Sequence, residues 1–122
     1  MPKTVMLIDD ETLVVEIAKK KLADKGYRVI TANDGEEALA LLNPADKPDL
    51  IVTDIQMPKM TGYAFLMEMR KNPDFAAIPV MVITAYADME PLFKRHAVKA
   101  YLLKPLKLQE LMDKITAALP LN

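Results

Sequence analysis

The chain has 122 residues, a length typical of one domain, since domains commonly have about 100–150 residues and can then bury a substantial core. Its 16 basic and 17 acidic residues nearly cancel, so composition does not support binding of nucleic acid or an anionic membrane through bulk charge. The absence of cysteine excludes disulfides, thiolate metal sites and thiol catalysis. Because no signal peptide is visible and no apolar run reaches the roughly 18 residues of a membrane span, the sequence predicts a soluble, cytoplasmic protein.

Short apolar segments of strand type alternate with helical patterns along the chain. Five segments rich in Val, Ile and Leu are predicted to be strands, at residues 3–8, 28–32, 50–53, 78–84 and 100–103. These segments are too apolar to leave one face in water. The alternation therefore predicts a doubly wound (βα)5 fold, with a five-stranded parallel sheet covered by helices on both faces.

The helices are indicated by apolar residues at helical spacing and by residues suited to caps. The first should end at Gly26, a good left-handed cap, and its buried face is expected to consist of Val14, Ile17, Ala18 and Leu22. The second opens at Asn33 or Asp34, where a Glu three residues later resembles a capping box. The third and fifth are expected to bury Phe65, Leu66, Met69, Leu108, Leu111, Met112, Ile115 and Leu119.

The fourth helix is the least regular, because Pro91 lies in the middle of the segment between the fourth and fifth strands. Proline is tolerated only in the first turn of a helix. We therefore expect a short helix that begins near Glu90 or Pro91 and lasts about two turns.

Polar side chains follow four of the five predicted strands. Asp54 ends the apolar run 50–53, the run Asp9-Asp10-Glu11 follows the first strand, and Thr84 and Lys104 lie at the ends of the fourth and fifth. The carboxyl ends of parallel strands meet at one edge of the sheet, which is where open α/β sheets bind ligands. The sequence thus predicts a site built from carboxylates, a hydroxyl and an ammonium group.

These groups suit phosphoryl transfer to a carboxylate. Asp9, Asp10 and Asp54 would repel one another when ionised, and a hard divalent cation such as Mg2+ would remove that conflict. Lys104 and the Thr84 hydroxyl could then hold the remaining oxygens of a phosphoryl group on Asp54. In this interpretation the carboxylate of Asp54 is the nucleophile, and the product is an aspartyl phosphate.

Four motifs in this order resemble the receiver domain of two-component response regulators, the CheY-like family. The motifs are Asp9-Asp10-Glu11, Asp54-x-x-Met57-Pro58-x-Met60-x-Gly62, Thr84-Ala85 and Lys104-Pro105. The resemblance covers nearly the whole chain and implies the flavodoxin-like strand order 2-1-3-4-5. It also implies that residues 1–122 form a single receiver domain, with no output domain in this chain.

The resemblance assigns a role to each site residue. It implies that Asp54 accepts the phosphoryl group, and that Asp10, Asp54 and the backbone carbonyl of Gln56 ligate Mg2+ or Mn2+, with Asp9 acting mainly through water. Lys104 would pair with the carboxylate before the reaction and with the phosphoryl group afterwards. The donor would be a phosphohistidine on a sensor histidine kinase or a phosphotransfer protein.

The resemblance also implies a conformational switch. Thr84 would move toward the phosphoryl oxygens, and Tyr101 matches an aromatic residue that swings inward with it. Signalling would proceed through the face formed by the fourth helix, fifth strand and fifth helix. Pro105 matches a cis proline of the family. The resemblance further implies that Gln56 and Tyr86 border the path of the hydrolytic water, and we expect the bulky Tyr86 to slow loss of the phosphoryl group.

The expected protein is a signalling switch rather than an enzyme, apart from its own phosphorylation and dephosphorylation. Its downstream target would be another protein, with no direct contact to nucleic acid or membrane. It would be a monomer or a phosphorylation-dependent homodimer. The segment 97–100, Ala-Val-Lys-Ala, departs from the Gly-Ala followed by polar residues that is frequent in the family, and Leu106 replaces a frequent Phe, so no known partner is transferred to this surface.

Each motif alone also has a purely structural interpretation. Asp54 could be a turn residue, Asp9 and Asp10 could cap the first helix, and Thr84 could be an ordinary strand residue. Lys104 could be a solvated surface lysine, while Tyr101 could serve only in packing. The order of all four motifs at successive strand ends favours the functional interpretation.

Two other functions would use a similar set of residues. A Mg2+-dependent phosphatase of the haloacid-dehalogenase type would normally carry Asp-x-Asp at its nucleophile and a lid domain, whereas here Gln56 follows two residues after Asp54. A receiver-like docking module that acts without phosphorylation is the other alternative. The complete acidic site argues against it.

Overall fold

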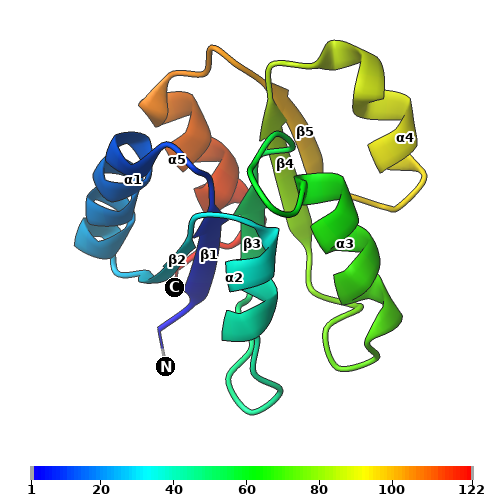
Figure 1. The fold of residues 1–122 in the computed structure, drawn as a ribbon. Coiled ribbons are helices and arrows are strands. Elements are labelled where there is room, and N and C mark those ends of the chain that lie inside the picture. Colours follow the sequence, from blue (N-terminus) through cyan, green and yellow to red (C-terminus); the bar gives the residue numbers. More distant parts are fainter. Residues whose placement is uncertain (1, 122) are drawn as a thin grey trace.

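The computed structural model describes residues 2–121, in which five strands alternate with five α-helices (Figure 1). The strands are β1 (Thr4–Ile8), β2 (Arg28–Ala32), β3 (Leu50–Thr53), β4 (Val80–Thr84) and β5 (Ala100–Leu103). The helices are α1 (Thr12–Lys25), α2 (Gly35–Leu41), α3 (Gly62–Lys71), α4 (Glu90–Lys94) and α5 (Leu108–Ala118). A short 3-10 turn, η1 (Ala87–Met89), precedes α4.

The five strands form one parallel sheet in the order β2-β1-β3-β4-β5. Strand β1 lies between two neighbours, so that Val5 pairs with Val29 on one side and with Leu50 on the other. The predicted fold and strand order are therefore confirmed. The predicted strands are correct to within two residues, because only β1 and β4 begin later than expected, at Thr4 and Val80.

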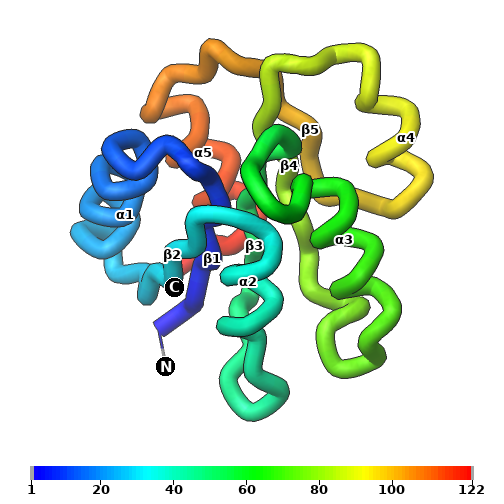
Figure 2. Tube along the Cα trace, in the orientation of Figure 1, coloured from blue at the N-terminus to red at the C-terminus, as the bar shows by residue number. Residues whose placement is uncertain are grey.

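Helices cover both faces of the sheet and create two hydrophobic cores (Figure 1). Helices α1 and α5 pack on one face, where Leu22 and Ile115 are fully buried. Helices α2, α3 and α4 cover the other face, with Phe65 and Phe93 fully buried. Figure 2 shows that the connections after β1, β3, β4 and β5 all leave the same edge of the sheet, opposite the end where the chain termini lie.

The buried face of α1 differs from the predicted one. Ala18 and Leu22 are buried as expected, but the third buried residue is Val15, while Val14 and Ile17 are about half exposed. The row Val15, Ala18 and Leu22 has helical i, i+3, i+7 spacing and points at the sheet, which places the other two residues on the flank of that row. Leu13 is still more exposed, so α1 carries an apolar outer edge.

The helix caps agree with the sequence. Gly26 ends α1 with φ of 110°, in the left-handed region that glycine adopts without steric cost. Asp34 is the N-cap of α2, and its carboxylate accepts a hydrogen bond from the backbone N–H of Glu37 at 2.9 Å.

Helix α4 begins at Glu90 with Pro91 in its first turn, as predicted, but has only five residues and is shorter than the two turns expected. Phe93 holds it against the sheet. The chain then turns at Ala97, which has φ of 54°. A left-handed conformation at a non-glycine residue costs about 1–2 kcal/mol, so the connection from α4 to β5 carries backbone strain.

Replacement of Ala97 by glycine should relieve this strain. We expect Ala97→Gly to raise the free energy of unfolding by about 1 kcal/mol, because the steric cost disappears while glycine loses somewhat more backbone entropy. Urea denaturation measures the change. The matched control is Ala23→Gly in the exposed part of α1, which should lower stability by about 1 kcal/mol. A loss of stability in both variants would contradict the assignment of strain to Ala97.

Candidate functional site

The backbone ladder of the sheet fixes the residues that follow the strands. The N–H of Asp54 donates to the carbonyl of Ile8 at 3.0 Å, which holds the end of β3 beside the end of β1. Between the ends of β4 and β5, the N–H of Lys104 donates to the carbonyl of Thr84 at 2.7 Å. Side chains from β1, β3, β4 and β5 therefore meet at the carboxyl edge, as the sequence predicted.

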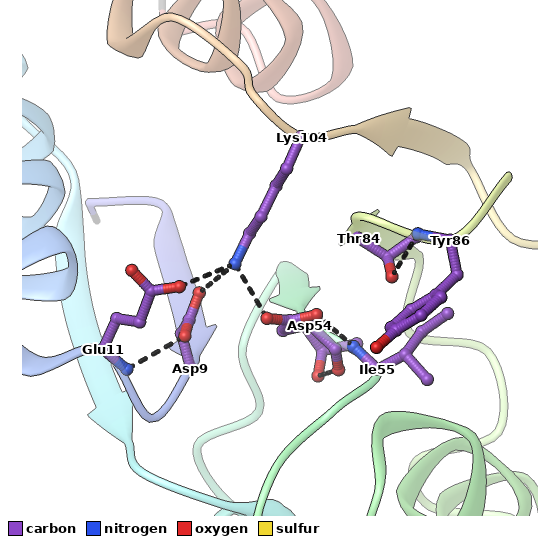
Figure 3. Close-up of polar contacts among 8 residues, drawn as sticks. Asp9, Glu11, Asp54, Ile55, Thr84, Tyr86 and Lys104 are labelled. Atoms are coloured by element: carbon purple, nitrogen blue, oxygen red, sulfur yellow. Dashed lines mark hydrogen bonds and ion pairs between the residues drawn. The ribbon is translucent and has the colours of Figure 1, made fainter.

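The ammonium group of Lys104 lies among three carboxylates (Figure 3). Its Nζ atom is 2.8 Å from Oδ2 of Asp54, 3.2 Å from Oε1 of Glu11 and 3.4 Å from Oδ2 of Asp9. The three acids come from the loop after β3 and the loop after β1, while Lys104 follows β5. One cation thus compensates acidic groups from two neighbouring strands.

Asp54 is held through both of its side-chain oxygens. Its Oδ1 accepts a hydrogen bond from the backbone N–H of Ile55 at 2.6 Å, and its Oδ2 faces Lys104. The Thr53 hydroxyl donates to the backbone carbonyl of Asp54 at 2.8 Å. Only 9% of the Asp54 side chain is exposed, so the carboxylate has a defined orientation in a largely dry position.

Gly62 allows the first turn of α3 to approach this site. A Cβ atom at this position would lie 2.1 Å from the backbone carbonyl oxygen of Asp54, far inside van der Waals contact. The N–H of Gly62 also donates to the carbonyl of Ile55 at 2.8 Å. The glycine of the second sequence motif is therefore needed for α3 to pack directly against the backbone of Asp54.

The surroundings of the site shift the pKa values of two ionisable groups. Burial raises the pKa of Asp9, and the hydrogen bond from the N–H of Glu11 and the charge of Lys104 offset this only in part. Desolvation lowers the pKa of Lys104, but the hydrogen bond to Asp54 and the charges of Asp9 and Asp54 outweigh it, so that its pKa is raised. Lys104 is held as a cation, whereas the ionised form of Asp9 is less favourable in the folded protein than it is in water.

Three carboxylates in this cluster form a donor set that fits a hard divalent cation. Asp9, Glu11 and Asp54 each offer one oxygen, and these oxygens lie within 4.8 Å of one another. Asp10 is exposed and lies outside this group, and Gln56 is exposed in the loop after Asp54. The cluster thus contains two of the three carboxylates implied by the resemblance, Asp9 and Asp54.

Glu11 is the site residue that the sequence interpretation missed. The Asp9-Asp10-Glu11 motif contains it, but the resemblance assigns it no role. It is the N-cap residue of α1, where no side chain caps the helix, and its own side chain turns back toward Lys104. The available signal was a third acidic residue next to an acidic pair, but the direction of its side chain depends on a lysine 93 residues away.

The two residues expected to form the switch both bond to the backbone of Tyr86. Thr84 is fully buried, and its hydroxyl oxygen accepts a hydrogen bond from the backbone N–H of Tyr86 at 3.2 Å. The hydroxyl of Tyr101 donates to the backbone carbonyl of Tyr86, and its ring packs near Phe93. In Figure 3, Thr84 and Tyr86 lie on the side of Asp54 opposite Lys104.

The site opens beside a cleft of about 480 Å³ between α1 and the start of α5. The cleft is lined mainly by apolar side chains of α1 and of strands β1, β3 and β4, together with Asp54 and Lys104. Val14 contributes to the wall from α1 and Leu106 from the loop before α5. The peptide bond between Lys104 and Pro105, at the edge of this cleft, is cis, as the resemblance implied.

A family model of the response regulator receiver domain matches residues 5–116. The chain belongs to this family. A probable transcriptional regulator, ycf27, of Guillardia theta is 38% identical over 117 residues, which cover 94% of this chain but 44% of that protein. The polar-differentiation response regulator DivK of Brucella anthropi is 31% identical and is covered over 98% of both chains. This receiver domain thus spans about half the length of several curated relatives and nearly all of another.

Solved structures agree with this assignment. The chemotaxis response regulator CheY4 of Vibrio cholerae is 28% identical and superimposes with a TM-score of 0.85 over 98% of this chain and 100% of that one. The response regulator TrrA of Thermotoga maritima, in complex with Mg2+ and BeF, is 31% identical with a TM-score of 0.80 over 96% of this chain and 99% of that one. No helix in residues 2–121 of the receiver domain is both long and apolar enough to cross a bilayer.

The raised pKa of Asp9 predicts that this residue lowers the stability of the metal-free receiver domain as the pH rises. A carboxyl whose pKa is raised by folding stabilises the fold below its ordinary value of 3.8, and this contribution is lost as pH rises through the folded value. Asp9→Asn should therefore become more stable than the natural protein as pH increases above about 4.

Urea denaturation between pH 4 and pH 7 in the presence of a chelator measures this difference. Asp24→Asn, which removes a carboxylate from the exposed surface of α1, serves as the control for the general loss of a negative charge. A stability difference between Asp9→Asn and the natural protein that shrinks with rising pH would contradict the role of burial at Asp9.

Proposed function

We propose that this receiver domain is a phosphorylation-controlled signalling switch in which Asp54 accepts a phosphoryl group. The observation that carries the proposal is the carboxylate of Asp54, oriented by the N–H of Ile55 and the ammonium of Lys104 at the carboxyl edge of a parallel sheet. The donor is a phosphohistidine on a sensor histidine kinase or a phosphotransfer protein. The protein acts in the cytoplasm, on a protein target, and catalyses only its own phosphorylation and dephosphorylation.

The chemistry is an in-line substitution at phosphorus. A carboxylate oxygen of Asp54 forms the new P–O bond while the bond from phosphorus to the imidazole nitrogen of the donor breaks, and that nitrogen keeps the electron pair. Lys104 already lies 2.8 Å from Asp54 Oδ2, so its ammonium is placed to balance negative charge on the transferred group. Positioning and charge neutralisation are the main requirements of phosphoryl transfer.

The acidic cluster supports a role for Mg2+ or Mn2+ in this reaction. Oxygen ligands suit these cations, and Asp9 and Asp54 already offer oxygens at the site. The ligands we propose are Asp10, Asp54 and the carbonyl of Gln56, with Asp9 acting through water. When bound, the cation would neutralise the clustered carboxylates and the phosphoryl oxygens. Asp10 would need to turn inward from its exposed position to take part.

The hydrogen bonds around Tyr86 support a route from the site to the surface. The Thr84 hydroxyl that would contact the phosphoryl group now accepts a hydrogen bond from the N–H of Tyr86, so its movement would release that N–H. Tyr101 donates to the carbonyl of the same residue, in the next peptide unit. We propose that the backbone of Tyr86 couples phosphorylation to the face formed by α4, β5 and α5, through a shift between two conformations.

Intact-mass analysis after incubation with acetyl phosphate and Mg2+ tests the proposal. We expect the natural protein to gain about 80 Da, the mass of one phosphoryl group, in an alkali-labile form that requires Mg2+. Asp54→Ala should gain nothing, while its circular dichroism spectrum shows an intact fold. The control variant is Asp49→Asn, which removes a carboxylate at the opposite end of β3 and should be phosphorylated normally.

Absence of the adduct from a folded natural protein would contradict the proposed chemistry. It would favour a receiver-like docking module that acts without phosphorylation. Modification that persists in Asp54→Ala would show that another residue accepts the phosphoryl group.

Tyr86 provides a test of phosphoryl lifetime. Its side chain is partly exposed in the connection after β4, near Thr84, and we propose that it obstructs the approach of water to the phosphoryl group. Tyr86→Ala should lose the phosphoryl group several-fold faster, in the range of roughly two- to tenfold if the obstruction is worth about 0.5–1.4 kcal/mol. The decay is followed by mass spectrometry after removal of acetyl phosphate. An unchanged rate would refute the obstruction, and Tyr86→Phe, which keeps the ring, should decay as the natural protein does.

A further inference from the structure

Lys104 has no free hydrogen-bond donor in the unphosphorylated site. An ammonium group carries three N–H bonds, and Nζ of Lys104 has three carboxylate partners, in Asp54, Glu11 and Asp9. A phosphoryl group on Asp54 would bring additional, more highly charged oxygen acceptors to the same ammonium. Phosphorylation converts the Asp54 carboxylate into an acyl phosphate, so one bond of Lys104 can pass to the phosphoryl group directly, whereas a second bond requires that Lys104 give up Asp9 or Glu11.

Glu11 differs from the other two partners in its exposure. Its side chain is 56% exposed, whereas those of Asp9 and Asp54 are 16% and 9% exposed. An exposed carboxylate that loses its ion-pair partner regains water, while a buried one is left poorly solvated. Of the two partners that remain when Asp54 is phosphorylated, Glu11 is therefore the one that Lys104 can release at the lower cost.

The backbone of Glu11 is fixed even though its side chain is exposed. Its N–H donates to Oδ1 of Asp9 at 3.0 Å, at the point where the chain leaves β1 and enters α1. The side chain consequently starts from a defined position and reaches Lys104 with Oε1 at 3.2 Å. Figure 3 shows Glu11 and Asp54 on different sides of the ammonium group, so that Glu11 draws Lys104 toward the β1 side of the site.

We propose that Glu11 is a positioning residue that competes with the phosphoryl group for Lys104. In the unphosphorylated protein it retains the ammonium on the side of β1, and a second bond from the ammonium to the phosphoryl group requires that this contact be broken. The inference rests on the proposed function of Asp54 and adds a residue that opposes the phosphorylated state. Glu11 thereby lowers the occupancy of that state without contacting the reacting atoms.

Removal of this contact should favour binding of a phosphoryl analogue. In Glu11→Gln the ammonium no longer has to leave a charged partner, so the affinity for beryllofluoride at saturating Mg2+ should increase roughly two- to fivefold, the range typical of an exposed ion pair. Glu11→Asp keeps the negative charge but is one methylene shorter and loses the contact. It should show most of the same gain.

The experiment titrates beryllofluoride into the 15N-labelled natural protein and its variants at saturating Mg2+, and follows binding in amide NMR spectra. Glu16→Gln, which removes an exposed charge from α1 on a side chain that makes no ion pair in residues 2–121, is the matched control and should bind as the natural protein does. A second measurement records hydrogen exchange of the Lys104 ammonium without Mg2+ or beryllofluoride. Exchange should be faster in Glu11→Gln and Glu11→Asp than in the natural protein.

The outcomes separate this inference from the function on which it rests. If the natural protein binds beryllofluoride but Glu11→Gln binds it no more tightly, the competition is refuted while the proposed function stands. A gain in Glu11→Gln that Glu11→Asp lacks, or that Glu16→Gln shares, would indicate general charge rather than the contact and would also refute it. Failure of the folded natural protein to bind beryllofluoride with Mg2+ would overturn both the inference and the proposed function.

Discussion

The ion pairs of Lys104 connect the acidic residues that follow β1 and β3 with the end of strand β5. Asp54 and Asp9 follow neighbouring strands in the middle of the sheet, where the parallel arrangement brings their charges together, and Lys104 arrives from the edge strand β5. The repulsion among the acids and their compensation by one ammonium are thus consequences of the fold. Lys104 also follows β5 directly in the chain, so the group that balances the acids is anchored next to the surface strand and Tyr101.

The site is stabilised by backbone geometry as much as by charge. The carboxylate of Asp54 accepts a hydrogen bond from the backbone N–H of Ile55, and the backbone carbonyl of Asp54 lies against Gly62 at the start of α3. These contacts leave little freedom for the carboxylate before any ligand binds. The more adaptable part lies on the other side, where Thr84 and Tyr101 both bond to the backbone of Tyr86 and where the short α4 is joined to β5 through a strained residue.

Features set by local chemistry could be predicted from the sequence. The strands, the cap at Gly26, the start of α4 near Pro91 and the alignment of polar residues at strand ends depend on neighbours in the chain or on the common edge of a parallel sheet. The exposure of Val14 and Ile17 could not be predicted, because several registers of α1 bury a similar number of apolar residues and the sheet selects one. The contact of Glu11 depends on distant residues in the same way.

The exposed edge of α1 has a consequence for how such a protein diversifies. Leu13 is 75% exposed and Val14 and Ile17 are about half exposed, and Val14 also lines the cleft that includes Asp54. Substitutions at exposed positions usually change stability by less than about 0.5 kcal/mol, whereas those in the row Val15, Ala18 and Leu22 would disturb the core. Mutation can therefore change the surface beside the site almost without thermodynamic penalty, while the geometry of the reacting carboxylate is inherited unchanged.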